Sequence, residues 1–240
     1  MIRLRGKTAL FLAALLLLSA ALGSCSVKKK DASRTPSNPM DYMFDEPDHS
    51  VTGVRTPLTL MQKTAAEHGR TVNYPFVCDE DMPLLNKSIQ SVFMDFAEEC
   101  EATGVTVSYS AEFNRFGLLS FLLQCRTADG RTIAVDTANF DCDTGRRVFL
   151  SDCFGTGSTD YPQRLEELVL HSIETGGGTL LAEGPDITDS TPFLFTFGGM
   201  YIVFREYELL SFDAGSPRIK VSVGQLTGYI AQDGLMNRLK

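Results

Sequence analysis

The stretch from Phe193 to Leu226 has the clearest strand pattern in the chain and constrains its fold most. Phe193, Phe195 and Phe197 alternate at the period of a β-strand, so they are expected to share one face. Gly198-Gly199 has the composition of a tight hairpin turn, and the apolar run after it is expected to return as a partner strand. Residues 218–223 resume the alternation. The pattern predicts antiparallel sheet here.

Apolar residues at the helical period predict two helices elsewhere in the chain. The first begins after Asp81 and ends near Gly104; the second begins after Asp160 and ends at residues 176–178. Each has a proline in its first turn, where the missing N–H costs nothing. The expected buried faces are Leu85, Ile89, Val92, Phe93, Phe96 and Cys100 in the first helix, and Leu165, Leu168, Val169 and Ile173 in the second.

The middle of the chain is expected to be strands joined by hairpin turns, at Asp129-Gly130 and at Asp143-Thr144-Gly145. Loops are expected at residues 151–159 and 179–192. The predicted fold class is α+β, an antiparallel meander sheet with two helices packed on one face. The expected strands outside the 193–226 stretch are residues 71–77, 105–115, 117–128, 131–141 and 146–150.

The N-terminus has the pattern of a secretory signal. Three basic residues precede an apolar run over residues 9–18, which is too short for a membrane span of about 20 residues. Leu22-Gly23-Ser24-Cys25 closes the segment and resembles the bacterial lipobox. That resemblance implies cleavage after residue 24 and a diacylglycerol thioether on Cys25, with palmitate-type acyl chains holding the protein to a membrane. The expected location is the extracytoplasmic side of a bacterial membrane, the outer membrane if one is present.

Residues 25–57 are polar, contain a lysine triplet and several prolines, and are interpreted as a flexible tether. A chain of about 30 residues spans roughly 30 Å, enough to hold a folded domain clear of lipid headgroups. The folded part is predicted as two modules, an N-terminal partner module over residues 58–138 and a C-terminal domain over residues 139–240.

Charge argues against nucleic acid as a partner. The whole chain has a formal net charge of −8, and removal of the signal, which contains three basic and no acidic residues, leaves −11. An acidic surface repels phosphate and attracts cationic proteins.

Five cysteines remain once Cys25 is lipidated, so they cannot all pair within one chain. Two pairings stay open, Cys142 with Cys153 and Cys78 with Cys100. None of the cysteines has zinc-site spacing with a histidine, so neither a metal nor another cofactor is expected.

Two blocks resemble a known family. Phe204, Tyr207, Ala214, Gly215 and Leu226 fall at its recurrent points, and "NFDCDTGRRVFLSDCF", residues 139–154, matches its strand, Asp-x-x-x-Gly turn and Leu-Ser-Asp-x-Phe exit. The chain resembles the RsiV-like C-terminal domain family, exported domains of unknown function that a smaller partner domain often precedes. Glu206 and Leu210-Ser211 depart from it, since prolines often occupy these positions.

The resemblance implies a membrane-anchored extracytoplasmic binding module for lysozyme-like enzymes or cell-wall glycan, because relatives include a lysozyme-recognising anti-sigma factor and domains fused to peptidoglycan deacetylases. The residues expected to contact the ligand are Tyr201, Tyr207, Phe212 and Asp213.

No catalytic constellation is visible, so the chain is not expected to be an enzyme. His49, His68 and His171 have no nucleophile motif beside them. Asp141 and Asp143 superficially resemble a calcium loop, but a hairpin turn is the favoured interpretation. A scaffolding envelope lipoprotein remains the main alternative function, and an envelope hydrolase a weaker one.

Overall fold

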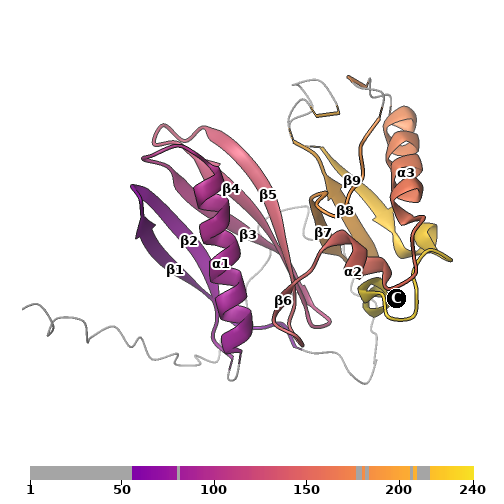
Figure 1. Cartoon of the computed structure of the whole chain (residues 1–240), viewed down its shortest axis with the longest axis horizontal. Coiled ribbons are helices and arrows are strands. Elements are labelled where there is room, and N and C mark those ends of the chain that lie inside the picture. The colour runs from indigo at the N-terminus through magenta and orange to yellow at the C-terminus, as the bar shows by residue number, and fades with distance from the viewer. Residues whose placement is uncertain (1–55, 80–81, 177–179, 182–183, 206–207, 210–216) are drawn as a thin grey trace, which may run out of the picture. The chain divides into compact units, whose positions relative to one another are not determined.

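The computed structural model describes residues 56–79, 82–176, 180–181, 184–205, 208–209 and 217–240. They belong to the unit that runs from Ser50 to Lys240. Its architecture is α+β, as predicted, with one sheet of six strands and one of three (Figure 1). Cys25 and the predicted signal peptide lie outside the described residues.

The six-stranded sheet is mixed. β2 and β3 pair in parallel at Thr71↔Thr106 and Val72↔Val107. α1 (Pro83–Glu99) connects them and returns the chain to the end of the sheet at which β2 began, so β3 runs in the same direction as β2. The predicted antiparallel meander is therefore wrong at this pair, although the other neighbours are antiparallel. The strands, in their order across the sheet, are β1 (Leu60–Glu67), β2 (Arg70–Val77), β3 (Thr106–Arg115), β4 (Leu118–Arg126), β5 (Thr132–Asp141) and β6 (Arg146–Arg147).

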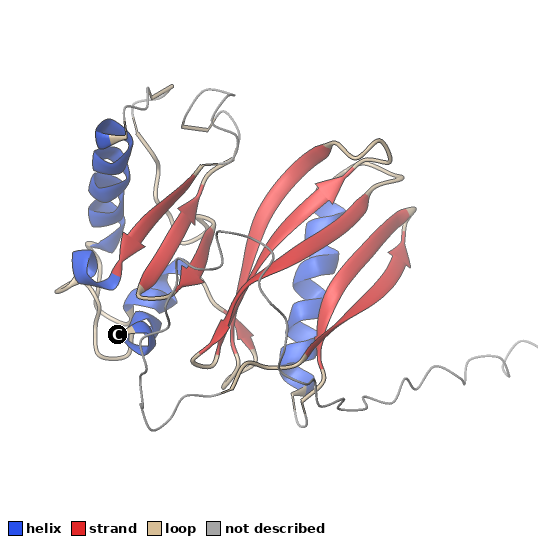
Figure 2. Ribbon diagram, turned by 180° about the vertical axis from the view of Figure 1, so that it is seen from behind, coloured by secondary structure: helices blue, strands red, loops and turns tan. Residues whose placement is uncertain are grey.

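α1 lies along one face of this sheet (Figure 2). All six residues of its predicted apolar face are buried, although the helix ends at Glu99 and not near Gly104. Phe93 meets Tyr109 of β3 edge to face, with ring centroids 5.6 Å apart, and Phe121 of β4 at 6.1 Å. Such pairs contribute about 0.5–1.5 kcal/mol beyond area burial, so they fix the helix against the strands.

The three-stranded sheet consists of β7 (Phe193–Thr196), β8 (Gly199–Val203) and β9 (Arg218–Ser222). α3 (Tyr161–Thr175) packs on it, because its apolar stripe shares a core with Phe193 and Phe195. The prediction of one sheet with two helices on one face is therefore wrong, since each sheet has its own helix. The hairpin turn also differs from the prediction: Thr196 pairs with Gly199, so the loop residues are Phe197 and Gly198.

Short helices complete the unit. α2 (Leu150–Phe154) replaces part of the predicted strand and loop, and two 3-10 helices follow β9, at Val223–Leu226 and Leu235–Leu239. Within the described residues, no helix combines the length and the apolar character that crossing a membrane requires.

Side chains of the large sheet form hydrogen bonds with backbone groups on the free edge of β7. β7 pairs with β8 on one side only. On its other side, Phe193 N donates to Thr137 Oγ1 at 3.1 Å, Asn139 Nδ2 donates to Phe193 O at 2.7 Å, and Phe195 N donates to Ser120 Oγ at 2.9 Å. Ser120 Oγ in turn donates to Asn139 Oδ1 at 2.6 Å. This buried polar cluster, Ser120, Thr137 and Asn139, therefore joins the two sheets.

Cys100, Cys125 and Cys153 are buried as free thiols, so neither of the two pairings considered from the sequence is present. Burial raises the pKa of the Cys100 thiol to about 12 and that of Cys153 well above its ordinary value. Because the thiolate is the reactive form of cysteine, burial disfavours reactivity at these two positions.

Candidate functional site

Three of the four residues predicted to contact a ligand lie outside the described part of the chain. Tyr207, Phe212 and Asp213 lie outside the described residues. Tyr201 lies on β8, half-buried, and packs against the apolar group formed by Leu122, Leu194 and Val203.

A groove of about 630 Å³ lies where β5, β6 and the segment before β7 come together. We call it the Asp136 groove. It has carboxylates, arginines and hydroxyls in its walls, so it can both donate and accept hydrogen bonds. Its lining residues are Glu99, Asp136, Thr137, Asn139, Arg147, Val148, Phe149, Asp186, Thr188, Asp189, Ser190, Thr191, Pro192, Phe193, Arg205 and Glu208.

Asp136 and Arg147 lie together in this groove. Thr137 N donates to Asp136 Oδ1 at 2.7 Å, and Arg147 Nη2 lies 3.8 Å from Asp136 Oδ2. Arg147 Nη2 also donates to Thr137 O at 3.4 Å. Burial raises the pKa of the Asp136 carboxyl, and the Thr137 N–H and the nearby Arg147 and Arg205 charges oppose this only in part. The surroundings therefore stabilise the charged carboxylate less than water does, and a further hydrogen-bond donor would stabilise it.

Phe149 is an exposed aromatic at the edge of the groove. The chain is extended here, so successive side chains point to opposite sides: Val148 and Leu150 are buried while Phe149 is 44% exposed. Asp152 Oδ2 accepts a hydrogen bond from Phe149 N at 2.8 Å. Phe149 is the N-cap of α2 and Asp152 its third residue, so this bond holds the start of the helix in place. The Arg147 guanidinium lies 5.5 Å from the ring centroid, a cation–π distance. The ring is thus held in place and open to solvent.

A second groove, of about 660 Å³, shares Arg147, Val148 and Phe149 with the first. We call it the Asp233 groove. Thr156 donates to Asp233 Oδ2 from its backbone N at 3.0 Å and from its Oγ1 at 2.6 Å, which ties the C-terminal segment to the residues after α2. The lining residues are Ser88, Asp141, Thr144, Arg146, Arg147, Val148, Phe149, Ser151, Asp152, Gly155, Thr156, Asp233 and Leu235.

The Asp141 turn beside this groove is a hairpin, as favoured from the sequence. Asp141 pairs with Arg146 across β5 and β6. Its Oδ1 accepts from Arg238 Nη1 at 2.8 Å and its Oδ2 from Thr144 Oγ1 at 3.0 Å, while Arg238 also lies 3.5 Å from Asp143 Oδ2. A guanidinium therefore occupies the position that a cation would need.

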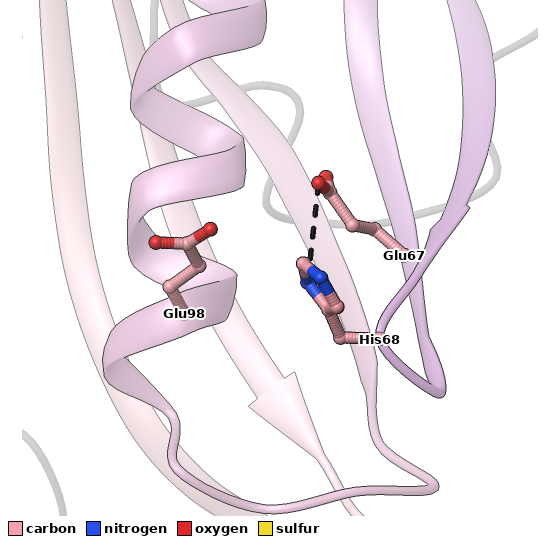
Figure 3. A group of neighbouring side chains, drawn as sticks. All are labelled: Glu67, His68 and Glu98. Atoms are coloured by element: carbon pink, nitrogen blue, oxygen red, sulfur yellow. Dashed lines mark ion pairs between the residues drawn. The ribbon is translucent and has the colours of Figure 1, made fainter.

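One group among the described residues has the donor set for a metal ion: Glu67, His68 and Glu98 (Figure 3). Their ligand atoms all lie within 4.8 Å of one another, and His68 Nδ1 is 3.9 Å from Glu67 Oε1. The hairpin turn between β1 and β2 brings the first two to the end of α1. All three are exposed, and such a group is common on surfaces without any ion. None of the three lines the Asp136 groove or the Asp233 groove.

Stability should depend on pH through Asp136. Because its pKa is raised in the folded state, the folded chain holds this proton to a higher pH than the unfolded chain, and its ionisation destabilises the fold as pH rises through the folded pKa. Asp136→Asn should therefore unfold at a higher urea concentration than the native protein at pH 7, and the difference should vanish as pH falls toward the ordinary value of 3.8. Urea unfolding at a series of pH values measures this.

Asp129 provides the opposite control. Its carboxylate accepts a hydrogen bond from the Thr127 hydroxyl, which lowers its pKa, so Asp129→Asn should cost stability at neutral pH and cost nothing at low pH. The same pH dependence in both variants would contradict the role given to burial of Asp136.

Comparison with solved structures shows proteins with a similar fold. No protein-family model matches the sequence, and no curated protein matches it. Among solved structures, a DUF3298 family protein from Pseudomonas aeruginosa PAO1 is similar, with 13% identity and a TM-score of 0.56 over 74% of this chain and 96% of that one. A member of the same family from Bacteroides fragilis NCTC 9343 has 13% identity and a TM-score of 0.50, over 78% and 97%. The chain therefore has a fold found in DUF3298 family proteins, while the resemblance to the RsiV-like family stays a prediction.

Proposed function

We propose that this chain is a binding module, held by lipid on Cys25 at the extracytoplasmic side of a bacterial membrane, and that it recognises cell-wall glycan. The observation that supports this most is the exposed Phe149 ring, which lines two adjoining grooves with both polar and apolar walls. A sugar ring offers an apolar C–H face that packs on an aromatic ring, and hydroxyls that both donate and accept. The Arg147 guanidinium lies beside the Phe149 ring and can donate, while Asp136 lines the same groove and can accept.

We propose binding without cleavage. Two of the carboxylates in the Asp136 groove already serve the backbone: Asp189 Oδ1 accepts from Ser151 N at 2.7 Å, and Glu208 Oε2 accepts from Arg205 N at 2.7 Å. These groups hold loops in place, so they are poorly suited to shuttle protons for hydrolysis.

Phe149→Ala should weaken retention of the full chain, in detergent, on insoluble peptidoglycan by at least about tenfold, which corresponds to about 1.4 kcal/mol. Sedimentation with the glycan, followed by quantification of free protein, measures the effect. Phe197→Ala is the matched control, because this phenylalanine is also exposed, at 55%, but contacts Phe113 and Phe116 and lines neither groove.

Equal retention of the two variants would remove Phe149 from the site, and no retention of the native chain would overturn the glycan proposal. A cationic wall-lytic enzyme of the lysozyme type is then the second candidate. The net charge of −11 after signal cleavage favours it, and its binding should weaken steeply with added salt.

A further inference from the structure

The Asp136 groove and the Asp233 groove meet at one ridge. Arg147, Val148 and Phe149 line both of them, so the two grooves adjoin at this segment of extended chain. From this geometry we infer that the ligand is an extended glycan strand that crosses Phe149 and occupies both grooves, and not a single sugar. The inference rests on the proposed function and specifies its ligand.

The size of the grooves supports a strand. At about 630 and 660 Å³, each lies within the range of roughly 300–1,000 Å³ that holds a drug-sized ligand. A single sugar would leave most of either groove filled with water, whereas consecutive sugars can fill both. Linked contacts then add, because binding in the first groove raises the effective concentration of the strand at the second.

The ridge offers contacts along the whole path. Phe149 is exposed at its crest, and the Arg147 guanidinium lies beside the ring. Arg146 is exposed and lines the Asp233 groove but not the Asp136 groove, whereas Arg205 is exposed and lines only the Asp136 groove of the two. Each groove therefore has its own exposed arginine donor, and the two arginines form a matched pair for testing.

Calorimetric titration of the full chain in detergent tests the inference, with a disaccharide, a tetrasaccharide and an octasaccharide of peptide-free N-acetylhexosamine glycan. We expect Kd to fall by at least about 100-fold from the disaccharide to the octasaccharide. Arg146→Ala and Arg205→Ala should each weaken octasaccharide binding by about tenfold. Against the disaccharide, no more than one of the two should have an effect, because a short ligand fills one groove.

Two other results have distinct meanings. A Kd that does not change with length, with only one arginine variant affected throughout, would show that one groove suffices; this overturns the inference and leaves the proposed function standing. An absence of binding at every length, together with no retention on intact peptidoglycan, overturns the proposed function itself. Thermal unfolding should show both variants melting at the same midpoint as the native protein, since exposed substitutions rarely change stability.

Discussion

Replacing Asn139 with alanine is expected to lower the free energy of unfolding by about 2–4 kcal/mol. Asn139 is 2% exposed, and its amide donates to Phe193 O while accepting from the Ser120 hydroxyl. Alanine would leave the Phe193 carbonyl and the Ser120 hydroxyl buried without these partners, and each unsatisfied group costs about 1–3 kcal/mol. Urea unfolding monitored by circular dichroism measures the loss.

Asn73→Ala is the control for that experiment. Asn73 also lies on a strand, β2, but its Oδ1 accepts only solvent-exposed hydrogen bonds from Thr64 and Gln62. Water replaces these, so the cost should stay within about 0.5 kcal/mol. A similar cost for the two asparagines would mean that the junction between the sheets does not depend on the buried polar cluster.

A double-mutant cycle with Ser120→Ala separates the junction from simple packing loss. Ser120 bonds both Asn139 and the N–H of Phe195, so the two substitutions remove parts of one network. Their effects should fail to add by about 0.5–3 kcal/mol, as is usual for residues in one hydrogen-bond network.

Elements with a buried apolar face could be predicted from the sequence. α1 and α3 were found because their apolar residues recur at the helical period and all ten predicted positions are buried. The sequence does not predict β1, because this strand has no buried apolar face. Its burial pattern is exposed at six of eight positions, so this edge strand has no apolar alternation to detect. Its pairing with β2 depends on the two-residue turn at His68-Gly69, where both residues have positive φ.

The candidate site was only partly within reach of the sequence. The sequence predicts a strand for the "RRVFL" run and a loop after it, because a helix of five residues is too short to show a period. The available signal was Asp152, an acidic residue three positions after Phe149, which is the spacing of a helix cap. This signal is weak alone, because phenylalanine is not a preferred N-cap residue and its side chain cannot accept a hydrogen bond.

Groove formation and the junction between the sheets could not be predicted in this way. Ser120, Thr137 and Asn139 lie 54 to 75 residues away from their β7 partners, and within their strands they resemble ordinary polar positions. Only the tertiary structure shows that they are buried. The predicted module boundary between residues 138 and 139 stays a prediction, and β5 runs through it.

Replacing Gly199 with alanine is expected to cost about 3–5 kcal/mol of unfolding free energy. A Cβ at this position would overlap the carbonyl oxygen of Val221 and lie 2.9 Å from Ser222 Cα, both on the neighbouring strand β9. Backbone atoms cannot rotate away, so β9 must shift and lose ladder hydrogen bonds with β8. Overpacking costs about 1–3 kcal/mol, and each lost hydrogen bond adds about 0.5–1.5 kcal/mol. Urea unfolding measures it.

Gly198→Ala is the matched control, one residue earlier in the same hairpin. Gly198 has φ +67°, but a Cβ there would meet nothing within 4 Å, so the cost should be only the left-handed penalty of about 1–2 kcal/mol. The two adjacent glycines are therefore required for different reasons, the first for turn conformation and the second for the close approach of β9. A smaller loss for Gly199→Ala than for Gly198→Ala would show that β9 can move away from β8 at this point, and that turn conformation alone accounts for the glycine pair.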